Sequence, residues 1–81
     1  METTSARQRR VEWLLRHREL WQDFPATIAQ MSSAHWVRQE QIIERMRAEG
    51  LYAQSTRARD VNLIKLLREA KRQHLRDPLA V

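Results

Sequence analysis

Apolar residues recur along the chain at intervals of three and four, with polar and charged residues between them. This spacing gives each helix one apolar face and predicts helices at about residues 5–22, 25–31, 34–49 and 56–75. The chain has one glycine and two prolines and is rich in Leu, Arg, Glu, Gln and Ala, which favours helix over sheet. We therefore expect an all-α fold without strands. It would be a small bundle of three long helices plus one short helix, forming a single domain over residues 1–81.

The last predicted helix is apolar around more than half of its circumference, which leaves only a narrow polar strip. A chain of 81 residues has difficulty covering so wide an apolar arc, so we expect it to form a homodimer. Trp13 lies at the edge of the apolar stripe of the first helix, and tryptophan is enriched at protein interfaces. The residues expected at the interface are Trp13, Leu63, Leu66 and Ala70.

Positive charge is concentrated in the C-terminal part of the chain. Fifteen Lys and Arg residues against ten Asp and Glu residues give a net charge of +5. Residues 51–81 hold seven of these cations and three of the acids, so the excess lies mostly in the last helix. This distribution fits a polyanionic partner that meets one face of the protein. The alternative interpretation is an ordinary arginine-rich surface in contact with solvent.

The only glycine, Gly50, lies between the third and fourth predicted helices. Glycine readily takes the left-handed conformation that ends a helix, so we expect a sharp reversal of the backbone there. The next helix would be capped by Ser55 or Thr56 and would carry Arg57 and Arg59 in its first turn. A helix, a tight turn and a second helix with a polar, basic start form the arrangement of helix-turn-helix DNA-binding proteins.

The stretch from Gly50 to Ile64 reads GLYAQSTRARDVNLI. It resembles the second and third helices of the winged-helix DNA-binding domain of bacterial arginine repressors, whose pattern is glycine, a short apolar turn, Gln-x-Thr-x-x-Arg-Asp-Ile and a later Leu. The matching positions are Gly50, Gln54, Thr56, Arg59 and Asp60, with Val61 and Ile64 as apolar equivalents. The chain departs from the pattern at Arg57 and Ala58, its turn is one residue shorter, and it shows neither the two-stranded wing nor the arginine-binding domain. The resemblance implies a mode of DNA reading, and neither a ligand nor a set of target genes.

Such a helix start favours a phosphate through its free N–H groups, while its side chains project into the major groove. Amides bind adenine edges and guanidinium groups bind guanine edges, whereas cations farther along the helix contact the phosphate backbone. The predicted DNA-binding residues are Gln54, Ser55, Thr56, Arg57, Arg59, Asn62, Lys65 and Arg72. Each has an ordinary structural explanation as well: the hydroxyls of Ser55 and Thr56 as helix caps, and the arginines as solvated surface.

Signs of catalysis are weak. The three histidines are far apart in sequence, and the chain has no glycine-rich phosphate loop and no recognisable Ser, His and Asp set. We therefore expect no enzyme, no cofactor, no metal site and no small-molecule substrate. The chain lacks cysteine and any apolar run long enough for a signal core or a membrane span, so we expect a soluble cytoplasmic protein without a membrane partner.

Two functions remain open from the residues alone. The leading hypothesis is a small basic helix-turn-helix protein that binds double-stranded DNA as a dimer, either to regulate transcription or to recognise DNA in a phage-type process. The alternative is a helical protein–protein interaction module, an adaptor or inhibitor, that docks through its wide apolar helix face and an exposed Trp13.

Overall fold

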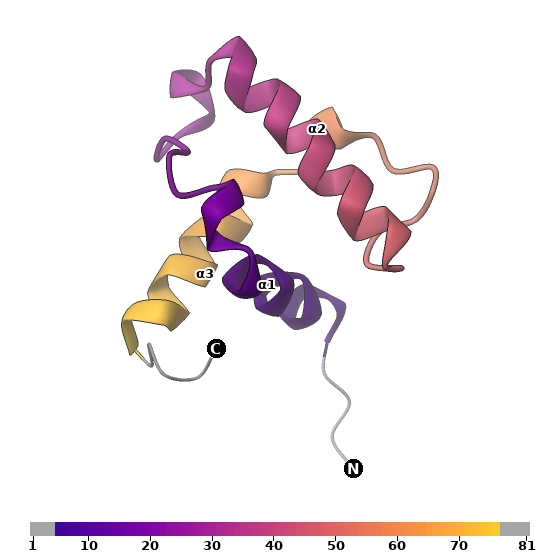
Figure 1. Cartoon of the computed structure of the whole chain (residues 1–81), viewed down its shortest axis with the longest axis horizontal. Helices are drawn as coiled ribbons and strands as arrows, with labels where there is room; N and C mark the ends of the chain where they lie inside the picture. Colours follow the sequence, from indigo (N-terminus) through magenta and orange to yellow (C-terminus); the bar gives the residue numbers. More distant parts are fainter. Residues whose placement is uncertain (1–4, 77–81) are drawn as a thin grey trace.

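The computed structural model describes residues 5–76 (Figure 1). Three α-helices and three short 3-10 helices follow one another: α1 (Ala6–Arg16), η1 (Arg18–Leu20), η2 (Ile28–Gln30), α2 (Ser33–Ala48), η3 (Ala58–Asp60) and α3 (Leu63–Arg76). No strand occurs within these residues, which confirms the predicted all-α class. None of the helices within 5–76 is long and apolar enough to cross a membrane.

The core lies where α1 packs against α3, with α2 running across the upper part of the molecule in Figure 1. Helices α1 and α3 both contribute large apolar side chains, and α2 adds Ile42, Ile43 and Met46. All are buried in one continuous cluster. A single chain therefore encloses the apolar faces of all three helices.

The residues predicted at a dimer interface belong to this core. Trp13, Leu63 and Ala70 are 0% exposed and Leu66 is 8% exposed. The indole N–H of Trp13 donates to Glu49 Oε2 at 2.6 Å, which ties α1 to the end of α2. The wide apolar arc of α3 is thus covered from within the chain, because α1 lies against it. This corrects the prediction: the four side chains are not available to a second subunit.

The first helix ends at Arg16, several residues before the predicted end near residue 22. The reason is a set of side-chain contacts that the periodic pattern does not show. Trp21 folds back so that its indole N–H donates to the Leu14 carbonyl at 2.8 Å, and the His17 ring Nδ1–H donates to the Trp13 carbonyl at 2.8 Å. These side chains satisfy carbonyls that a continuing helix would have used. The chain then turns through η1 and buries Trp21 and Phe24.

The predicted short helix at residues 25–31 is reduced to η2, a single 3-10 turn. Ile28 is 46% exposed, while Met31 packs against the core. Three residues cannot present a complete helical face, so only one end of this segment reaches the interior.

The third predicted helix agrees closely with α2. Ser32 caps it: the His35 N–H donates to Ser32 Oγ, and the Ser32 N–H donates to His35 Nδ1 at 3.0 Å, forming a reciprocal capping box. At the other end Gly50 takes a φ of 78°, and the Leu51 N–H donates to the Met46 carbonyl at 2.8 Å. The Gly50 N–H donates to the Arg47 carbonyl at 3.0 Å, which completes a Schellman motif. The predicted reversal at Gly50 is confirmed.

The helix after the reversal begins at Leu63 rather than near residue 56. Asn62 provides the cap, since its Oδ1 accepts the N–H of Lys65 at 3.2 Å. Upstream of this cap, the buried Gln39 amide donates to the Ala58 carbonyl at 2.8 Å and to the Val61 carbonyl at 3.1 Å. The Ala58 carbonyl also accepts the Val61 N–H at 3.2 Å, so these residues form the 3-10 turn η3, which Gln39 holds against α2. The connection between α2 and α3 is therefore a loop of residues 50–62 that contains η3, and a tight helix-turn-helix is not what this segment forms.

We expect Gln39→Leu to lower the free energy of unfolding by about 1 to 3 kcal/mol, because two backbone carbonyls lose their donor. Urea denaturation followed by circular dichroism measures the change. Gln41→Leu is the matched control, since Gln41 is exposed on the same helix and its replacement should change stability by less than about 0.5 kcal/mol. Equal effects from both substitutions would contradict the role given to Gln39.

Candidate nucleic-acid interface

The loop of residues 50–62 is held at both ends. At its start, Arg10 of α1 donates from Nε to the Leu51 carbonyl at 2.7 Å, and its guanidinium carbon lies 4.1 Å from the centre of the Tyr52 ring. At its end, Gln39 of α2 binds the carbonyls of Ala58 and Val61. Two helices therefore fix a segment that has only one short helix of its own.

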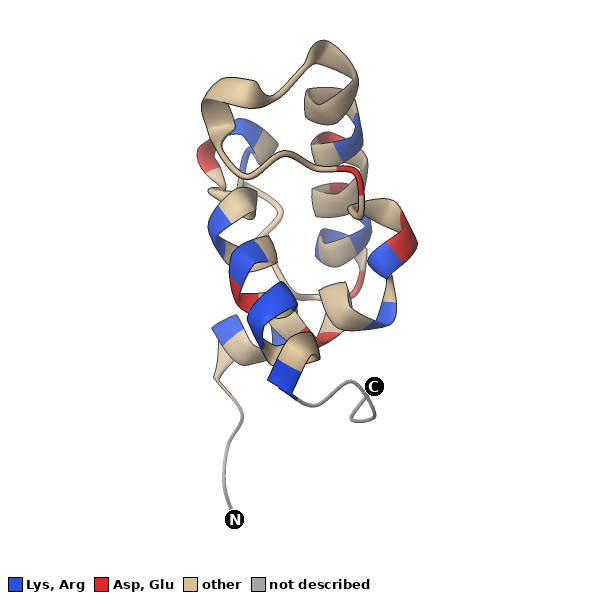
Figure 2. Cartoon of the chain, turned by 90° about the vertical axis from the view of Figure 1, so that its left-hand side faces the viewer, with Lys and Arg blue, Asp and Glu red and all other residues tan. Residues whose placement is uncertain are grey.

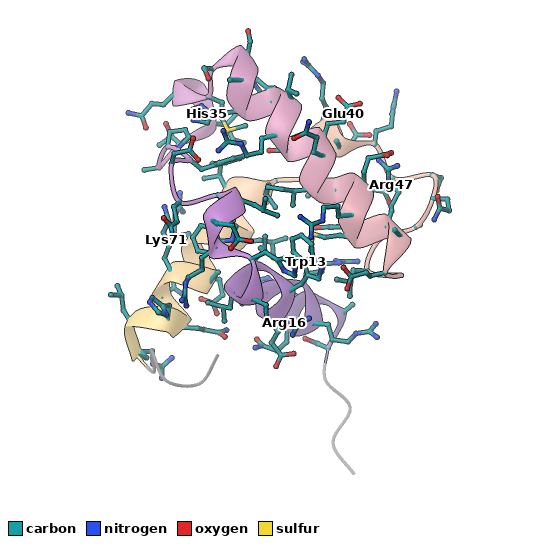
Figure 3. All side chains as sticks on the ribbon, viewed as in Figure 1. Trp13, Arg16, His35, Glu40, Arg47 and Lys71 are labelled. Atoms are coloured by element: carbon teal, nitrogen blue, oxygen red, sulfur yellow. The ribbon has the colours of Figure 1, made fainter. Side chains whose placement is uncertain are left out.

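Between these anchors the loop and α2 enclose a shallow hollow. Five of the predicted DNA-binding residues line it, namely Gln54, Ser55, Thr56, Arg57 and Arg59. From α2 come Glu40 and Arg47, which Figure 3 labels on the side of the helix that faces the loop. The structure thus brings these five residues together as predicted, but on a loop and η3 instead of the first turn of a helix.

The two arginines of this hollow have different surroundings. Arg57 is highly exposed and pairs through Nε with Asp60 Oδ2 at 3.2 Å. The guanidinium carbon of Arg59 lies 5.2 Å from the centre of the Trp36 ring on α2. No carboxylate within residues 5–76 lies inside 4.0 Å of the Arg59 guanidinium nitrogens. Arg59 is therefore positioned by an aromatic ring and has no acidic partner within residues 5–76.

The remaining predicted residues lie on or next to α3. The Asn62 carbonyl oxygen is used as the helix cap, and Lys65 lines a second hollow with Arg68 and with Thr27 and Ile28 near η2. Arg72 pairs with Glu69, which also lies 4.0 Å from Arg7 of α1. Arg72 is therefore separate from the hollow at η3, and the predicted residues form two neighbouring groups.

Five exposed cations occur along α3, and we call them the basic face: Lys65, Arg68, Lys71, Arg72 and Arg76. With about 100° per residue, Lys65, Arg68, Arg72 and Arg76 fall within an arc of about 80°, and Lys71 borders it. Glu69 is the one acidic residue of this helix. Figure 2 looks onto the side of the molecule where α3 lies, and Lys and Arg recur along this helix down to its C-terminal end.

Sequence reasoning identified Lys65 and Arg72 and missed the rest of the basic face. Arg68 and Lys71 border the apolar arc, where a long cationic side chain commonly covers apolar surface with its stem. Both are exposed, although Arg68 also donates to the Ala26 carbonyl at 3.3 Å. The available signal was the ratio of five cations to one acid between residues 63 and 76.

The histidines have structural partners. His17 stacks on Trp13 with ring centres 4.0 Å apart, His35 completes the cap of α2, and His74 Nδ1 lies 3.0 Å from Arg18 Nη1. Within residues 5–76, no three His, Asp or Glu side chains converge as metal ligands.

Comparison of the chain with models of protein families, with curated proteins and with solved structures finds no match.

Tyr52 provides a test of the loop's placement, because it is the only tyrosine of the chain. Burial raises the pKa of Tyr52 above its ordinary value of 10.0, and the nearby Arg10 charge partly opposes this rise. In the folded protein the phenol therefore keeps its proton at a pH where the unfolded chain has released it. The stability contributed by this group is full below about pH 10 and is lost as the pH rises through the folded pKa.

We expect the phenolate absorbance of the folded protein to appear at higher pH than that of the chain unfolded in urea. In Arg10→Gln the midpoint should rise further, because the opposing positive charge is gone. A folded midpoint at or below that of the unfolded chain would show that Tyr52 is not packed as described.

Proposed function

We propose that the chain binds double-stranded DNA through the basic face of α3, with η3 and the hollow beside it at the N-terminal edge of the contact. The observation that carries the proposal is the concentration of five exposed cations on one helix that holds a single acid. Cations grouped in this way attract a phosphate backbone and release the counterions condensed on it.

The dimensions support a duplex as the partner. From Lys65 to Arg76 the helix rises by about 16 Å, at about 1.5 Å per residue, and an α-helix fits the major groove of B-DNA. The buried side of α3 packs in the core, while the cationic side is exposed. One helix can therefore face the polyanion without losing its packing. This arrangement needs no tight turn before α3.

The Glu69 carboxylate holds two arginines at the basic face. It is mostly buried and lies between Arg7 of α1 and Arg72 of α3. Beside it, the Gln8 and Gln73 amides exchange two hydrogen bonds of 3.1 Å each. Arg7 is thereby held next to the basic face, and the contact surface extends from α3 onto α1.

The alternative function, a protein-docking module, has less support. It depended on the wide apolar face of α3 and on an exposed Trp13, and both are buried. Leu75 is the one large apolar side chain of α3 that is well exposed. Protein interfaces are centred on clusters of apolar and aromatic residues, which the basic face does not provide.

Fluorescence anisotropy of a labelled random-sequence duplex tests the proposal. We expect binding at about 50 mM salt that weakens steeply toward about 200 mM, with a slope of log affinity against log salt of about −4 if the cations of the basic face contact phosphates. In Lys65→Gln with Arg72→Gln the slope should become shallower by about 2, since each lost phosphate contact removes about 0.9.

The matched control is Arg9→Gln with Arg16→Gln, which removes the same charge from exposed positions of α1 outside the basic face. Its salt slope should stay close to that of the unmodified chain. Absence of binding at about 50 mM salt would overturn the proposal. Equal losses in the two double variants would show that total charge matters and that the basic face does not.

A further inference from the structure

One surface of α2 holds both the backbone and the side chain of Arg59. Gln39 binds the carbonyls of Ala58 and Val61, which flank Arg59 and Asp60 on either side. One helical turn earlier on α2, Trp36 lies under the Arg59 guanidinium, whose central carbon is 5.2 Å from the ring centre. The position of this guanidinium is therefore set before any partner binds.

A guanidinium that rests on an aromatic ring keeps its N–H groups free at the edge of its plane. Most other arginines near the hollow already have carboxylate partners: Arg57 pairs with Asp60, and Arg47 pairs with Glu44 at 2.8 Å. Arg59 has no such partner within residues 5–76 and is exposed. It is the arginine of the hollow best prepared to donate to a ligand.

The charges around Arg59 favour a base over a phosphate. Glu40 and Asp60 line the same hollow, and Glu40 also lines the smaller hollow formed by Trp36, Val37 and Arg59. Carboxylates repel a phosphate, but they accept hydrogen bonds from the cytosine amino group. A guanidinium donates in parallel to O6 and N7 of guanine. An arginine beside a glutamate therefore presents donors to the guanine and an acceptor to its cytosine partner.

We propose that Arg59 is a specificity-determining residue that binds the O6 and N7 edge of a guanine, and that Trp36 is the residue that positions it. The inference rests on the proposed DNA binding. The basic face of α3 supplies affinity for the backbone, while Arg59, Glu40 and the exposed Val37 contact base edges next to it. A G·C base pair is the preferred partner of this edge of the surface.

The test compares two short G·C-rich duplexes that differ at one ring atom of each guanine. In one of them 7-deazaguanine replaces guanine, which removes the N7 acceptor and leaves the phosphate charge unchanged. We expect the unmodified chain to bind the guanine duplex roughly tenfold more tightly, in the range for one bidentate base contact. Arg59→Ala should abolish this preference, because the guanidinium is lost. Arg59→Lys should keep the salt slope and only part of the preference, because an ammonium can still donate to O6 or N7 but lacks the planar fork.

Trp36→Ala should reduce the preference, while Trp36→Phe, which keeps an aromatic ring, should retain part of it. Circular dichroism establishes that each variant is folded, and Trp36→Phe provides the test if Trp36→Ala does not fold. A preference that disappears in Arg59→Ala and falls in the Trp36 variants would support the proposal.

Four results would count against it. Salt-dependent binding of both duplexes with equal affinity would mean that Arg59 contacts no guanine N7, while the proposed DNA binding stands. A preference that persists in Arg59→Ala would assign it to another residue, and one that is unchanged in both Trp36 variants would remove the positioning role. No binding to either duplex at low salt would overturn both proposals.

Discussion

The hydrogen bonds of one buried amide determine how the second half of the molecule is arranged. Gln39 is 2% exposed and is the one buried polar residue of the described chain. Burial of an amide is costly unless it is hydrogen-bonded, and Gln39 meets this requirement by binding the carbonyls of Ala58 and Val61. The same two bonds hold the segment of residues 58–61, which contains a 3-10 turn, in place. They fix η3 against α2 and leave Asn62 to start α3, whose basic face is then directed outward.

The fold could be predicted from sequence where its causes are local. The start of α2 follows from Ser32 and His35, three residues apart, and its end follows from Gly50 and Leu51. The early end of α1 could not be predicted in this way, because it depends on the Trp21 indole reaching back to the Leu14 carbonyl. Periodicity continues past such a point, since Trp21 still falls on the apolar stripe. A periodic pattern shows which residues are buried and is a weaker guide to where a helix ends.

In the candidate site, too, local features could be predicted from the sequence and contacts between distant segments could not. Residues 54 to 59 were expected to lie together because they are close in sequence, and they do line one hollow. The predicted helical conformation was wrong: these residues form a loop and a 3-10 turn that Gln39 holds against α2, and the helix begins only after the Asn62 cap. The roles of Trp36 and Glu40 beside Arg59 depend on a contact between segments some twenty residues apart. The proposed function depends more on the charges counted along α3 than on the apparent motif.

The three tryptophans occupy three different environments. Trp13 and Trp21 are buried and hydrogen-bonded within the core, whereas Trp36 is partly exposed beneath the Arg59 guanidinium. Two indoles are therefore shielded from any molecule that approaches the surface, and the third lies directly below the proposed contact. Intrinsic fluorescence from the solvent-accessible indole can thus act as a built-in optical reporter of events at this edge of the protein, against a background from the other two that follows only the integrity of the fold.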